Sequence, residues 1–456
     1  MRIFVIGEGK LGAALTRQLI NEKHDVVVID PDQNVLDKNE NILDALFIKG
    51  SGVNVETLEE TGIRRADVVI ATTISDETNM LACLTAKKLG AQYTIARIRD
   101  PQYLRSLPFL QKELEIDYVV NPERATAREI SRMLRFPFAD NIETFARGRV
   151  EMMDFKAAEE DCVVNIPLKE IYQKNKSLPR VLFCAVERDG KAIVPKGDFV
   201  ILPGDQVHVM ADVSAITAFF KAIGKDTDRV RNVMIMGGSR IAYYLADMLL
   251  EMNIGVSIVE INSDKARSMS ELLPGATIIQ GDGTDQELLT SEGMSGMDAF
   301  ITLSGRDEDN LMSGLYAAQT GVKKVIVKNN RDNYAAIIAK LGLQSIVSPQ
   351  TITCNSILRT VRARGSRSSD TVQRMYRLMD GKAEALEFIA EEGEDYIHIP
   401  LRELDIAQDC LIGVIVRDNT VKIPFGDDTL EPGDHVVVIS KAEGMATLNQ
   451  AFGGRH

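Results

Sequence analysis

The chain has 456 residues, of which 45% are hydrophobic and 26% charged, and its formal net charge is −13. This length suggests about three domains, and the acidic balance argues against a general affinity for nucleic acid or for an anionic membrane surface. No apolar run approaches the ~20 residues of a membrane span, and Met1 leads directly into an apolar stretch without a secretory signal. The five cysteines are scattered without a C-x-x-C pair, which predicts reduced thiols in a cytoplasmic protein.

The first thirty residues follow the order strand, glycine-rich turn, helix, strand and acid. An apolar run at 2–6 leads into a G-x-G-x-x-G motif made by Gly7, Gly9 and Gly12. These glycines allow a tight turn, a close approach of the backbone to phosphates and close helix packing, so the turn predicts a dinucleotide site at the helix start. Asp30 ends the second strand, at the place where a carboxylate can accept the ribose hydroxyls. Its charge favours NAD(H) or an unphosphorylated adenine nucleotide over NADP(H).

Apolar strands then alternate with amphipathic helices as far as about residue 133. Ser75 is expected to cap the helix that runs to Leu89. The alternation predicts a doubly wound parallel sheet. The predicted strands are 2–6, 26–29, 46–48, 66–71, 94–98 and 116–120.

From about Ile142 the pattern changes to short strands joined by turn residues. The turn chemistry comes from Asp189-Gly190 and Pro203-Gly204-Asp205. This pattern predicts a small strand-rich lobe of roughly 80 residues, followed by a linker at 224–229. The predicted strands of the lobe are 163–166, 181–187, 192–194 and 206–210.

The second half of the chain repeats the first. The spacing from Gly237 to Glu260 equals the spacing from Gly7 to Asp30, and Pro432-Gly433-Asp434 repeats the turn of the small lobe at nearly the same offset. The sequence therefore predicts an α/β protein, a tandem duplication of a Rossmann-like doubly wound parallel-sheet domain followed by a small strand-rich α+β lobe. The predicted domains are 1–138 (Rossmann-like), 139–226 (small lobe), 227–366 (Rossmann-like, with a degenerate glycine motif) and 367–456 (small lobe).

Further residues are expected at the first site because ligands of open α/β sheets lie beyond the carboxyl ends of the strands. Thr72 and Thr73 follow the fourth strand, and the Thr73 hydroxyl can position a ribose or nicotinamide-side oxygen. Arg97 lies in the fifth strand. It is expected either to reach a phosphate or its loop, or to form a salt bridge with Asp67 or Asp76.

The second glycine turn departs from the fingerprint. Ser239 and Ala242 replace the second and third glycines, and Arg240 takes the place of Lys10. The serine crowds a pyrophosphate, whereas alanine is tolerated and Glu260 keeps the ribose acceptor. We therefore expect weaker or different binding here: an altered pose, a mononucleotide, or no ligand. In the first turn, Lys10 is expected to face either the phosphates or solvent.

The sequence shows no pattern of catalytic residues, and its five histidines do not indicate catalysis. A dehydrogenase needs a substrate domain and an acid or base beside the nicotinamide. The sequence contains no Ser-His-Asp, Cys-His or metal-ligand spacing, and only a small lobe follows each nucleotide domain. Binding without chemistry, and therefore sensing, is the prediction, and no metal site is expected.

The sequence resembles the TrkA family, the cytoplasmic regulatory subunits of bacterial Trk potassium-uptake systems, built from two RCK (regulator of potassium conductance, or KTN) units. The segments that carry the resemblance are 7–12, 75–80, 95–99 and 281–285, and the likeness covers essentially the whole chain. It implies Rossmann-like RCK_N domains, each followed by an RCK_C lobe. It also implies a homo-oligomer, a dimer or a tetramer that forms a ring beneath a membrane channel.

The resemblance further implies a non-enzymatic protein, peripheral to the inner face of the plasma membrane, that controls potassium flux in response to NAD(H) and to ATP or ADP. Its implied partner is a membrane-embedded potassium channel or transporter subunit similar to TrkH or TrkG. By motif position, the first site comprises Gly7, Glu8, Gly9, Lys10, Leu11, Asp30, Thr72, Thr73 and Arg97, and the second comprises Gly237, Gly238, Ser239, Arg240, Ile241, Glu260, Ser304 and Lys328.

The resemblance also suggests roles for individual charged residues. Lys10 and Arg240 are expected to meet the terminal phosphate of ATP. Glu123 is similar to an acid near a bound cation in some relatives, and Gln350 stands in the equivalent place of the second half. Two alternative functions remain: an NAD-dependent oxidoreductase, and a nucleotide-gated regulator of a different transporter.

Overall fold

The protein forms two compact units, each assembled from both halves of the chain. Unit 1 combines Met1–Ser131 with Val230–Val361, and unit 2 combines Arg132–Arg229 with Arg362–His456. The computed structural model describes residues 1–40, 42–104, 106–135, 142–225, 230–330, 343, 345–365, 372–379, 382–407, 409–441, 445 and 447–452.

The first half of unit 1 is built on a parallel six-stranded sheet with the order β3-β2-β1-β4-β5-β6. This is the order of a Rossmann fold, and it confirms the predicted doubly wound sheet. The central strands read as continuous apolar runs because helices cover both faces of the sheet. Its strands are β1 (Arg2–Ile6), β2 (Asp25–Asp30), β3 (Leu46–Lys49), β4 (Val68–Ala71), β5 (Tyr93–Arg97) and β6 (Tyr118–Val120), and its helices are α1 (Lys10–Asn21), α2 (Gln33–Glu40), α3 (Val55–Glu60), η1 (Ile63–Arg65), α4 (Asp76–Leu89), α5 (Pro101–Leu104), α6 (Leu107–Glu113) and α7 (Pro122–Arg135).

The second half of unit 1 repeats this topology. Its parallel sheet has the order β14-β13-β12-β15-β16-β17, which confirms the duplication read from the residue offsets. Its strands are β12 (Asn232–Met236), β13 (Gly255–Glu260), β14 (Thr277–Gln280), β15 (Ala299–Thr302), β16 (Lys324–Lys328) and β17 (Ser345–Val347), and its helices are α10 (Arg240–Glu251), α11 (Ser263–Leu272), α12 (Gln286–Ser291), η3 (Met294–Gly296), α13 (Asp307–Gln319) and α15 (Pro349–Gly365).

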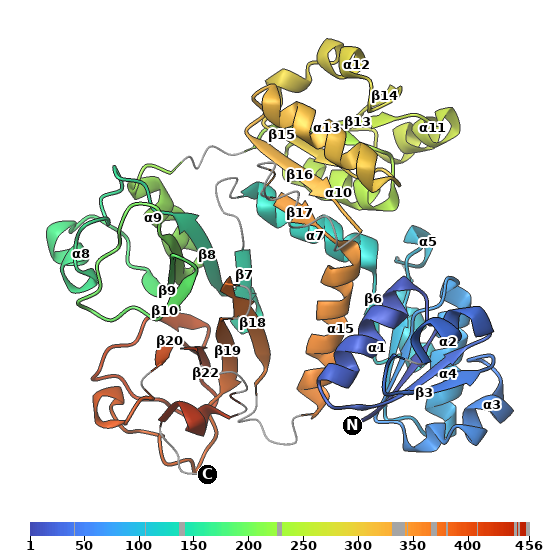
Figure 1. The fold of residues 1–456 in the computed structure, drawn as a ribbon, viewed down its shortest axis with the longest axis horizontal. Helices are drawn as coiled ribbons and strands as arrows, with labels where there is room; N and C mark the ends of the chain where they lie inside the picture. Colours follow the sequence, from blue (N-terminus) through green and yellow to red (C-terminus); the bar gives the residue numbers. More distant parts are fainter. Residues whose placement is uncertain are drawn as a thin grey trace. The chain divides into compact units, whose positions relative to one another are not determined.

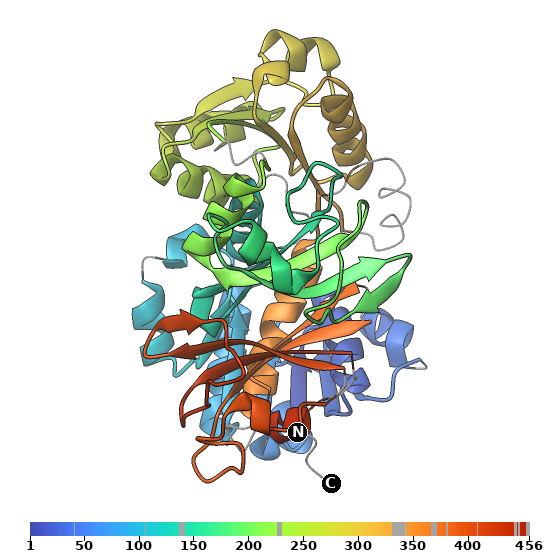
Figure 2. The same ribbon diagram turned by 90° about the vertical axis from the view of Figure 1, so that its left-hand side faces the viewer.

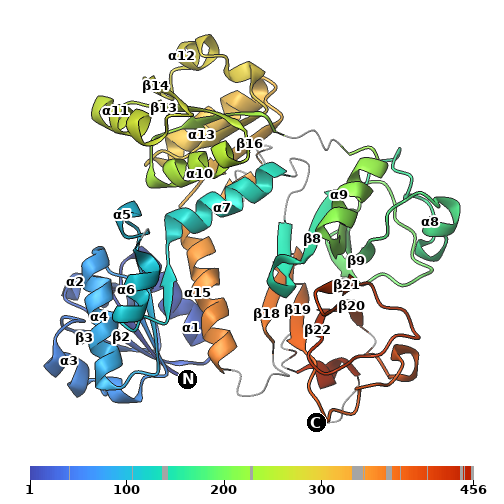
Figure 3. The same ribbon diagram turned by 180° about the vertical axis from the view of Figure 1, so that it is seen from behind.

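The last helix of the second half packs on the sheet of the first half. The α15 residues Cys354, Ile357, Leu358 and Val361 recur at the spacing of one helix face, and they are buried in one core with β1 and α1. Conversely, α7 leaves the first sheet and lies beside α10 of the second half (Figures 1 and 3). The two halves of unit 1 therefore exchange helices, a feature that the sequence pattern did not predict.

Unit 2 contains two antiparallel five-stranded sheets, with the orders β10-β9-β11-β8-β7 and β18-β19-β22-β20-β21. Figure 2 shows the two sheets side by side, and a shared apolar core joins them. The first lobe comprises β7 (Ile142–Phe145), η2 (Ala146–Gly148), β8 (Val150–Lys156), α8 (Leu168–Lys174), β9 (Leu182–Arg188), β10 (Lys191–Ile193), β11 (Gln206–Asp212) and α9 (Val213–Ala222), and the second comprises β18 (Arg374–Leu378), β19 (Ala383–Ile389), η6 (Leu401–Glu403), β20 (Cys410–Arg417), β21 (Thr420–Lys422), β22 (His435–Ser440) and η7 (Leu448–Phe452).

One predicted strand of the first lobe is wrong. Residues 163–166 form turns rather than a strand, because Asn165 adopts a φ of 60° and its amide bonds to the carbonyl oxygen of Ile201. Val163 and Val164 are nevertheless buried in the core of the lobe. An apolar pair fills a core from a turn as well as from a strand, so the pattern alone did not distinguish the two.

Both lobes contain an equivalent arginine–aspartate ion pair. The carboxylate of Asp205, in the Pro-Gly-Asp turn, accepts two hydrogen bonds from Arg188, at 2.7 and 2.8 Å. Asp434 accepts from Arg417 at 2.7 and 2.9 Å in the second lobe. The turn identified in the sequence therefore anchors one strand to its neighbour in each copy through a bidentate contact.

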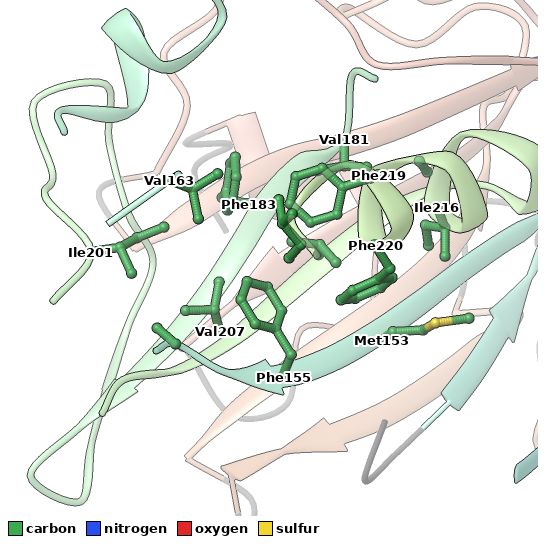
Figure 4. Packing of buried hydrophobic residues seen from close by; sticks show 14 of the residues in the cluster. Met153, Phe155, Val163, Val181, Phe183, Ile201, Val207, Ile216, Phe219 and Phe220 are labelled. Atoms are coloured by element: carbon green, nitrogen blue, oxygen red, sulfur yellow. The ribbon is translucent and has the colours of Figure 1, made fainter. Parts of the chain in front are cut away.

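We expect the aromatic core of the first lobe to dominate its stability. Phe219 is fully buried and meets Phe155, Phe183 and Phe220 edge to face, with centroids 5.4–6.3 Å apart (Figure 4). Phe219→Ala should cost about 3–5 kcal/mol of unfolding free energy, because it leaves a cavity. Calorimetric unfolding measures this, with Phe109→Ala as control since Phe109 is 64% exposed. Equal effects of the two changes would contradict the assignment of the core.

Candidate nucleotide-binding sites

The first glycine turn is shaped by three different constraints. Gly7 has a φ of 95°, and a Cβ atom there would lie 2.9 Å from the amide nitrogen of Thr73. A Cβ atom on Gly12 would lie 2.0 Å from the carbonyl oxygen of Gly7. A Cβ atom on Gly9 would have no protein atom within 4 Å, and Gly9 provides no side chain to cap α1. The backbone N–H groups at the start of α1 therefore face open space, which suits an anion.

Asp30 lies beside this turn at the end of β2. One of its carboxylate oxygens accepts a hydrogen bond from the amide of Glu8 at 2.8 Å, and the other accepts from the amide of Asp32 at 2.9 Å. These two contacts hold the carboxylate in place, and each oxygen keeps a further lone pair for a ligand hydroxyl. Lys10 is exposed at the mouth of the turn, whereas Leu11 is buried below it.

Glu8 has a different environment from the other residues of the turn. Its side chain is buried, and its two carboxylate oxygens accept hydrogen bonds from Thr16 and Asn39, both at 3.0 Å. Burial raises the pKa of this carboxyl to about 7, against the opposing effect of the two hydrogen bonds. The structure thus places its main chain at the predicted site and its carboxylate beneath the turn.

The residues after β4 are organised by Asn79, a buried side chain of α4. Its amide oxygen accepts from the amide and the hydroxyl of Thr73, both at 2.8 Å, and its amide nitrogen donates to the carbonyl oxygen of Arg97 at 2.9 Å. Thr72 donates its hydroxyl to the carbonyl oxygen of Gly7 at 3.0 Å. Asn79 is not among the residues predicted for the site, yet its side chain joins the segments that follow β4 and β5.

Arg97 does not form either of the salt bridges considered from the sequence. Its guanidinium donates to the carbonyl oxygen of Thr72 at 3.3 Å, and burial together with nearby Arg99 lowers its pKa. Within the described ranges, no ion pair joins Arg97 to Asp67 or Asp76, and both carboxylates accept hydrogen bonds from backbone amides instead. The guanidinium of Arg97 therefore lies beside the first site without pairing with either of these two carboxylates.

The second turn keeps the ribose acceptor but changes the helix start. Glu260 accepts from the amides of Gly238 and Asn262 at 2.6 and 2.8 Å, as Asp30 does from its own turn. The hydroxyl of Ser239 accepts from the amide of Ala242 at 3.3 Å, so it caps α10. A side chain thus occupies the position that stays open in the first turn. This contact supports the expectation of weaker or different binding at the second site.

The remaining residues predicted for the second site lie around its turn. Gly237 has a φ of 97° and packs against the amide nitrogen of Ser304, as Gly7 does against Thr73. Ile241 is buried, and Arg240 is exposed. Lys328 is the buried counterpart of Arg97; its ammonium donates to the carbonyl oxygen of Ser304, and burial lowers its pKa.

The first turn, and the helix that follows the second turn, each touch a segment of the other half of unit 1. Gln350, at the start of α15, donates to the carbonyl oxygen of Lys10 at 3.0 Å. On the other side, the hydroxyl of Tyr244 donates to the carbonyl oxygen of Arg99 at 3.0 Å and accepts from Asn121 at 3.3 Å. The exchanged helices therefore bring the two candidate sites into direct contact with the partner half.

Glu123 pairs with a cation supplied by the protein itself. Its carboxylate lies 2.6 Å from the guanidinium of Arg99, and the residue is 8% exposed. Over the described ranges, no group of three or more His, Cys, Asp or Glu side chains is arranged to hold a metal ion, and no helix has the length and apolar composition of a membrane span.

A separate hollow lies between the two lobes of unit 2. Its volume is about 1040 Å³, and both lobes contribute to its lining. The guanidinium of Arg180 lies over the rings of Tyr172 and Phe425, 5.7 and 5.4 Å from their centroids, and so bridges the two lobes. Neither lobe forms this hollow alone.

The fold and the paired glycine turns define a class of protein: two tandem RCK units. Comparisons with known proteins identify the family. The TrkA-N domain matches residues 3–122 and 233–349, and the TrkA-C domain matches residues 152–224 and 385–453. The Trk system potassium uptake protein TrkA homolog 1 of Methanosarcina mazei is 30% identical over 99% of this chain and 100% of its own length. The chain belongs to the TrkA family.

Solved structures support the fold. The GsuK channel bound to NAD has a TM-score of 0.63 at 17% identity and covers 100% of this chain and 79% of its own. GsuK bound to ADP has a TM-score of 0.52 at 14% identity and covers 80% of this chain and 69% of its own. The curated relative is named as a potassium uptake protein, in agreement with the prediction that this chain is not an enzyme.

The glycines of the first turn should respond differently to substitution. Gly12→Ala should destabilise the protein by about 1–3 kcal/mol, because the added methyl group collides with the backbone of Gly7. Gly9→Ser introduces the residue that the second turn has at Ser239. It should leave thermal stability unchanged or slightly raised, since the serine caps α1. Thermal unfolding of both variants measures this. A Gly12→Ala protein as stable as wild type would contradict the geometry of the turn.

Proposed function

We propose that this chain is a regulatory subunit of a Trk-type potassium uptake system, which binds NAD(H), and ATP or ADP, and gates a membrane-embedded potassium channel or transporter. The observation that supports nucleotide binding most directly is the uncapped start of α1 at a glycine with no protein atom near its open face. Asp30, held by two backbone amides, is the proposed ribose acceptor. Its negative charge would repel the 2′-phosphate of NADP(H).

The names of similar proteins support the choice of ligand and of partner. One GsuK structure is described as bound to NAD and another as bound to ADP. The relative from Methanosarcina mazei is named as part of a Trk system. We therefore assign this chain to the cytoplasmic face of the membrane, in a homo-oligomeric ring beneath a TrkH- or TrkG-like subunit.

The exchanged helices supply a mechanism for coupling the two sites. A nucleotide at the first turn changes the charge beside Lys10, whose carbonyl oxygen holds Gln350 of α15. A ligand at the second turn acts beside Tyr244, which holds the backbone of Arg99. Tilting of one half therefore strains contacts at both turns, and the ring then transmits that tilt to the channel. A nucleotide shifts this equilibrium only by its differential affinity for the two arrangements.

Removal of the ribose acceptor tests the first site. Asp30→Ala should weaken NADH binding roughly 10- to 100-fold, since hydrogen bonds to a charged acceptor are lost, and should uncouple potassium uptake from the nucleotide. Calorimetric titration gives the affinity, and circular dichroism checks the fold. Glu260→Ala is the matched control, which should leave binding at the first site intact. Unchanged NADH affinity in Asp30→Ala would rule out this assignment.

Association with the membrane partner is tested separately. The full chain should co-purify with a potassium channel or transporter subunit from its native membrane. Recovery with a transporter of another ion would favour regulation of that transporter instead. Steady oxidation of NADH by the purified chain with carbonyl substrates would contradict a purely regulatory role.

The contacts at the exchanged helices predict coupling between the sites. Tyr244→Phe removes the hydroxyl that joins Arg99 and Asn121. If the sites are coupled by a typical factor of roughly 5- to 150-fold, this variant should bring the effect of ATP on NADH affinity closer to none. Titration of NADH with and without saturating ATP measures it. Tyr243→Phe is the control on the same helix, and an equal effect of both variants would exclude the proposed route.

A further inference from the structure

The first glycine turn carries a buried acid where the second has none. Glu8 is 2% exposed, and its carboxylate is held by Thr16 of α1 and Asn39 of α2. Its counterpart in the second half is Gly238. The two turns otherwise hold their ribose acceptors in the same way, through the amide of this same position. The acid is therefore a feature of one site only.

In the second turn, the side chains of Met269 and Glu260 occupy the space that such a residue would enter. A Cβ atom on Gly238 would lie 2.6 Å from the sulfur of Met269 and 2.8 Å from a carboxylate oxygen of Glu260. In the first turn, the corresponding space between α1 and α2 holds the Glu8 carboxylate and its two neutral donors. The asymmetry between the turns is thus built into the packing around them.

The charged groups around Glu8 do not neutralise it. Asp30, on β2, repels the Glu8 carboxylate, and Arg17, on α1, attracts it more weakly than burial opposes its charge. Within the described ranges no ion pair involves Glu8, and its partners from α1 and α2 are the neutral side chains of Thr16 and Asn39. When Glu8 is ionised, its carboxylate beneath the turn and that of Asp30 at the end of β2 are therefore two negative charges near the start of α1.

We propose that Glu8 determines the nucleotide specificity of the first site by charge, making it favour NAD(H) over the more highly charged ADP and ATP. The inference rests on the proposed function and specifies the ligand class of that same site. Like charges separated by several ångströms at a partly buried site repel appreciably. This repulsion grows with each negative charge on the ligand, so it penalises terminal phosphates most.

The same geometry couples the binding of an anionic nucleotide to the protonation of Glu8. A bound polyanion disfavours the ionised form of Glu8, so the complex takes up a proton when Glu8 was ionised in the free protein. The pKa of Glu8 in the free protein is about 7. Affinity for ATP should therefore be highest below pH 7 and fall as the pH rises through this value, because Glu8 then becomes charged.

Displacement of NADH from the full-length protein tests this inference. The part of the NADH fluorescence that Asp30→Ala abolishes reports the first site, and NAD⁺, ADP and ATP are added as competitors between pH 6 and pH 8.5. Glu8→Gln keeps a hydrogen-bonding side chain of the same size but removes the charge. At pH 8 it should raise ATP affinity roughly tenfold, ADP affinity less and NAD⁺ affinity least. It should also remove the part of the pH dependence that wild type shows beyond the titration of the nucleotide itself.

Two further variants make the result specific. Glu60→Gln makes the same change at an exposed position of α3 and should leave the order of affinities unchanged. Glu8→Gly reproduces the second turn and should act like Glu8→Gln, which covers the case that the glutamine variant folds poorly. An equal change for all three competitors, or a wild-type pH dependence in both Glu8 variants, would overturn the inference. A wild-type protein that binds none of these nucleotides would overturn the proposed function and this inference with it.

Discussion

The burial of α15 against the first sheet is the contact on which unit 1 depends. Its apolar stripe completes a core made otherwise by the first sheet, α1 and Leu36 of α2, so a helix from the second half helps to cover this face of the first half. An amphipathic helix gains stability chiefly by packing its apolar face, and here that face is satisfied only when the two halves meet. The two Rossmann-like halves therefore share one core and form one compact unit.

This exchange also explains why the two glycine turns are not isolated binding loops. The start of α15 meets the backbone of the first turn, and Tyr244, in α10 behind the second turn, meets the segment that follows β5. Both candidate sites therefore lie at an interface between the halves. The contacts named here are hydrogen bonds to backbone carbonyls, and Arg240 of the second turn also lies 3.9 Å from the carboxylate of Asp100 in the first half.

The two turns share an architecture but differ in their electrostatics. In the first, an open helix start is combined with two acids, Asp30 and the buried Glu8. In the second, Ser239 caps the helix and a single acid, Glu260, remains. Duplication followed by divergence of the turn residues thus leaves one scaffold with two sites of different charge.

Much of the local structure follows from the sequence because it depends on short-range constraints. The glycine at φ 95°, the Ser75 cap of α4 and the Pro-Gly-Asp turns each express the backbone needs of a few residues. The parallel sheets follow from apolar strands that alternate with helices. The strand predicted for residues 163–166 was wrong, because burial of two valines does not determine backbone conformation.

Other features depended on the tertiary structure. Asn79 binds the backbone of Arg97, which follows it by most of α4 and a loop. The Glu8 carboxylate binds Asn39, which lies beyond α1 and β2. The exchange of α7 and α15 involves residues still further apart. The sequence by itself determined the duplicated fold and the location of the glycine turns, because periodicity and turn chemistry are local. Only the tertiary structure decided which helix covers which sheet and which acids lie close together, because packing selects among distant apolar faces that are equivalent in pattern.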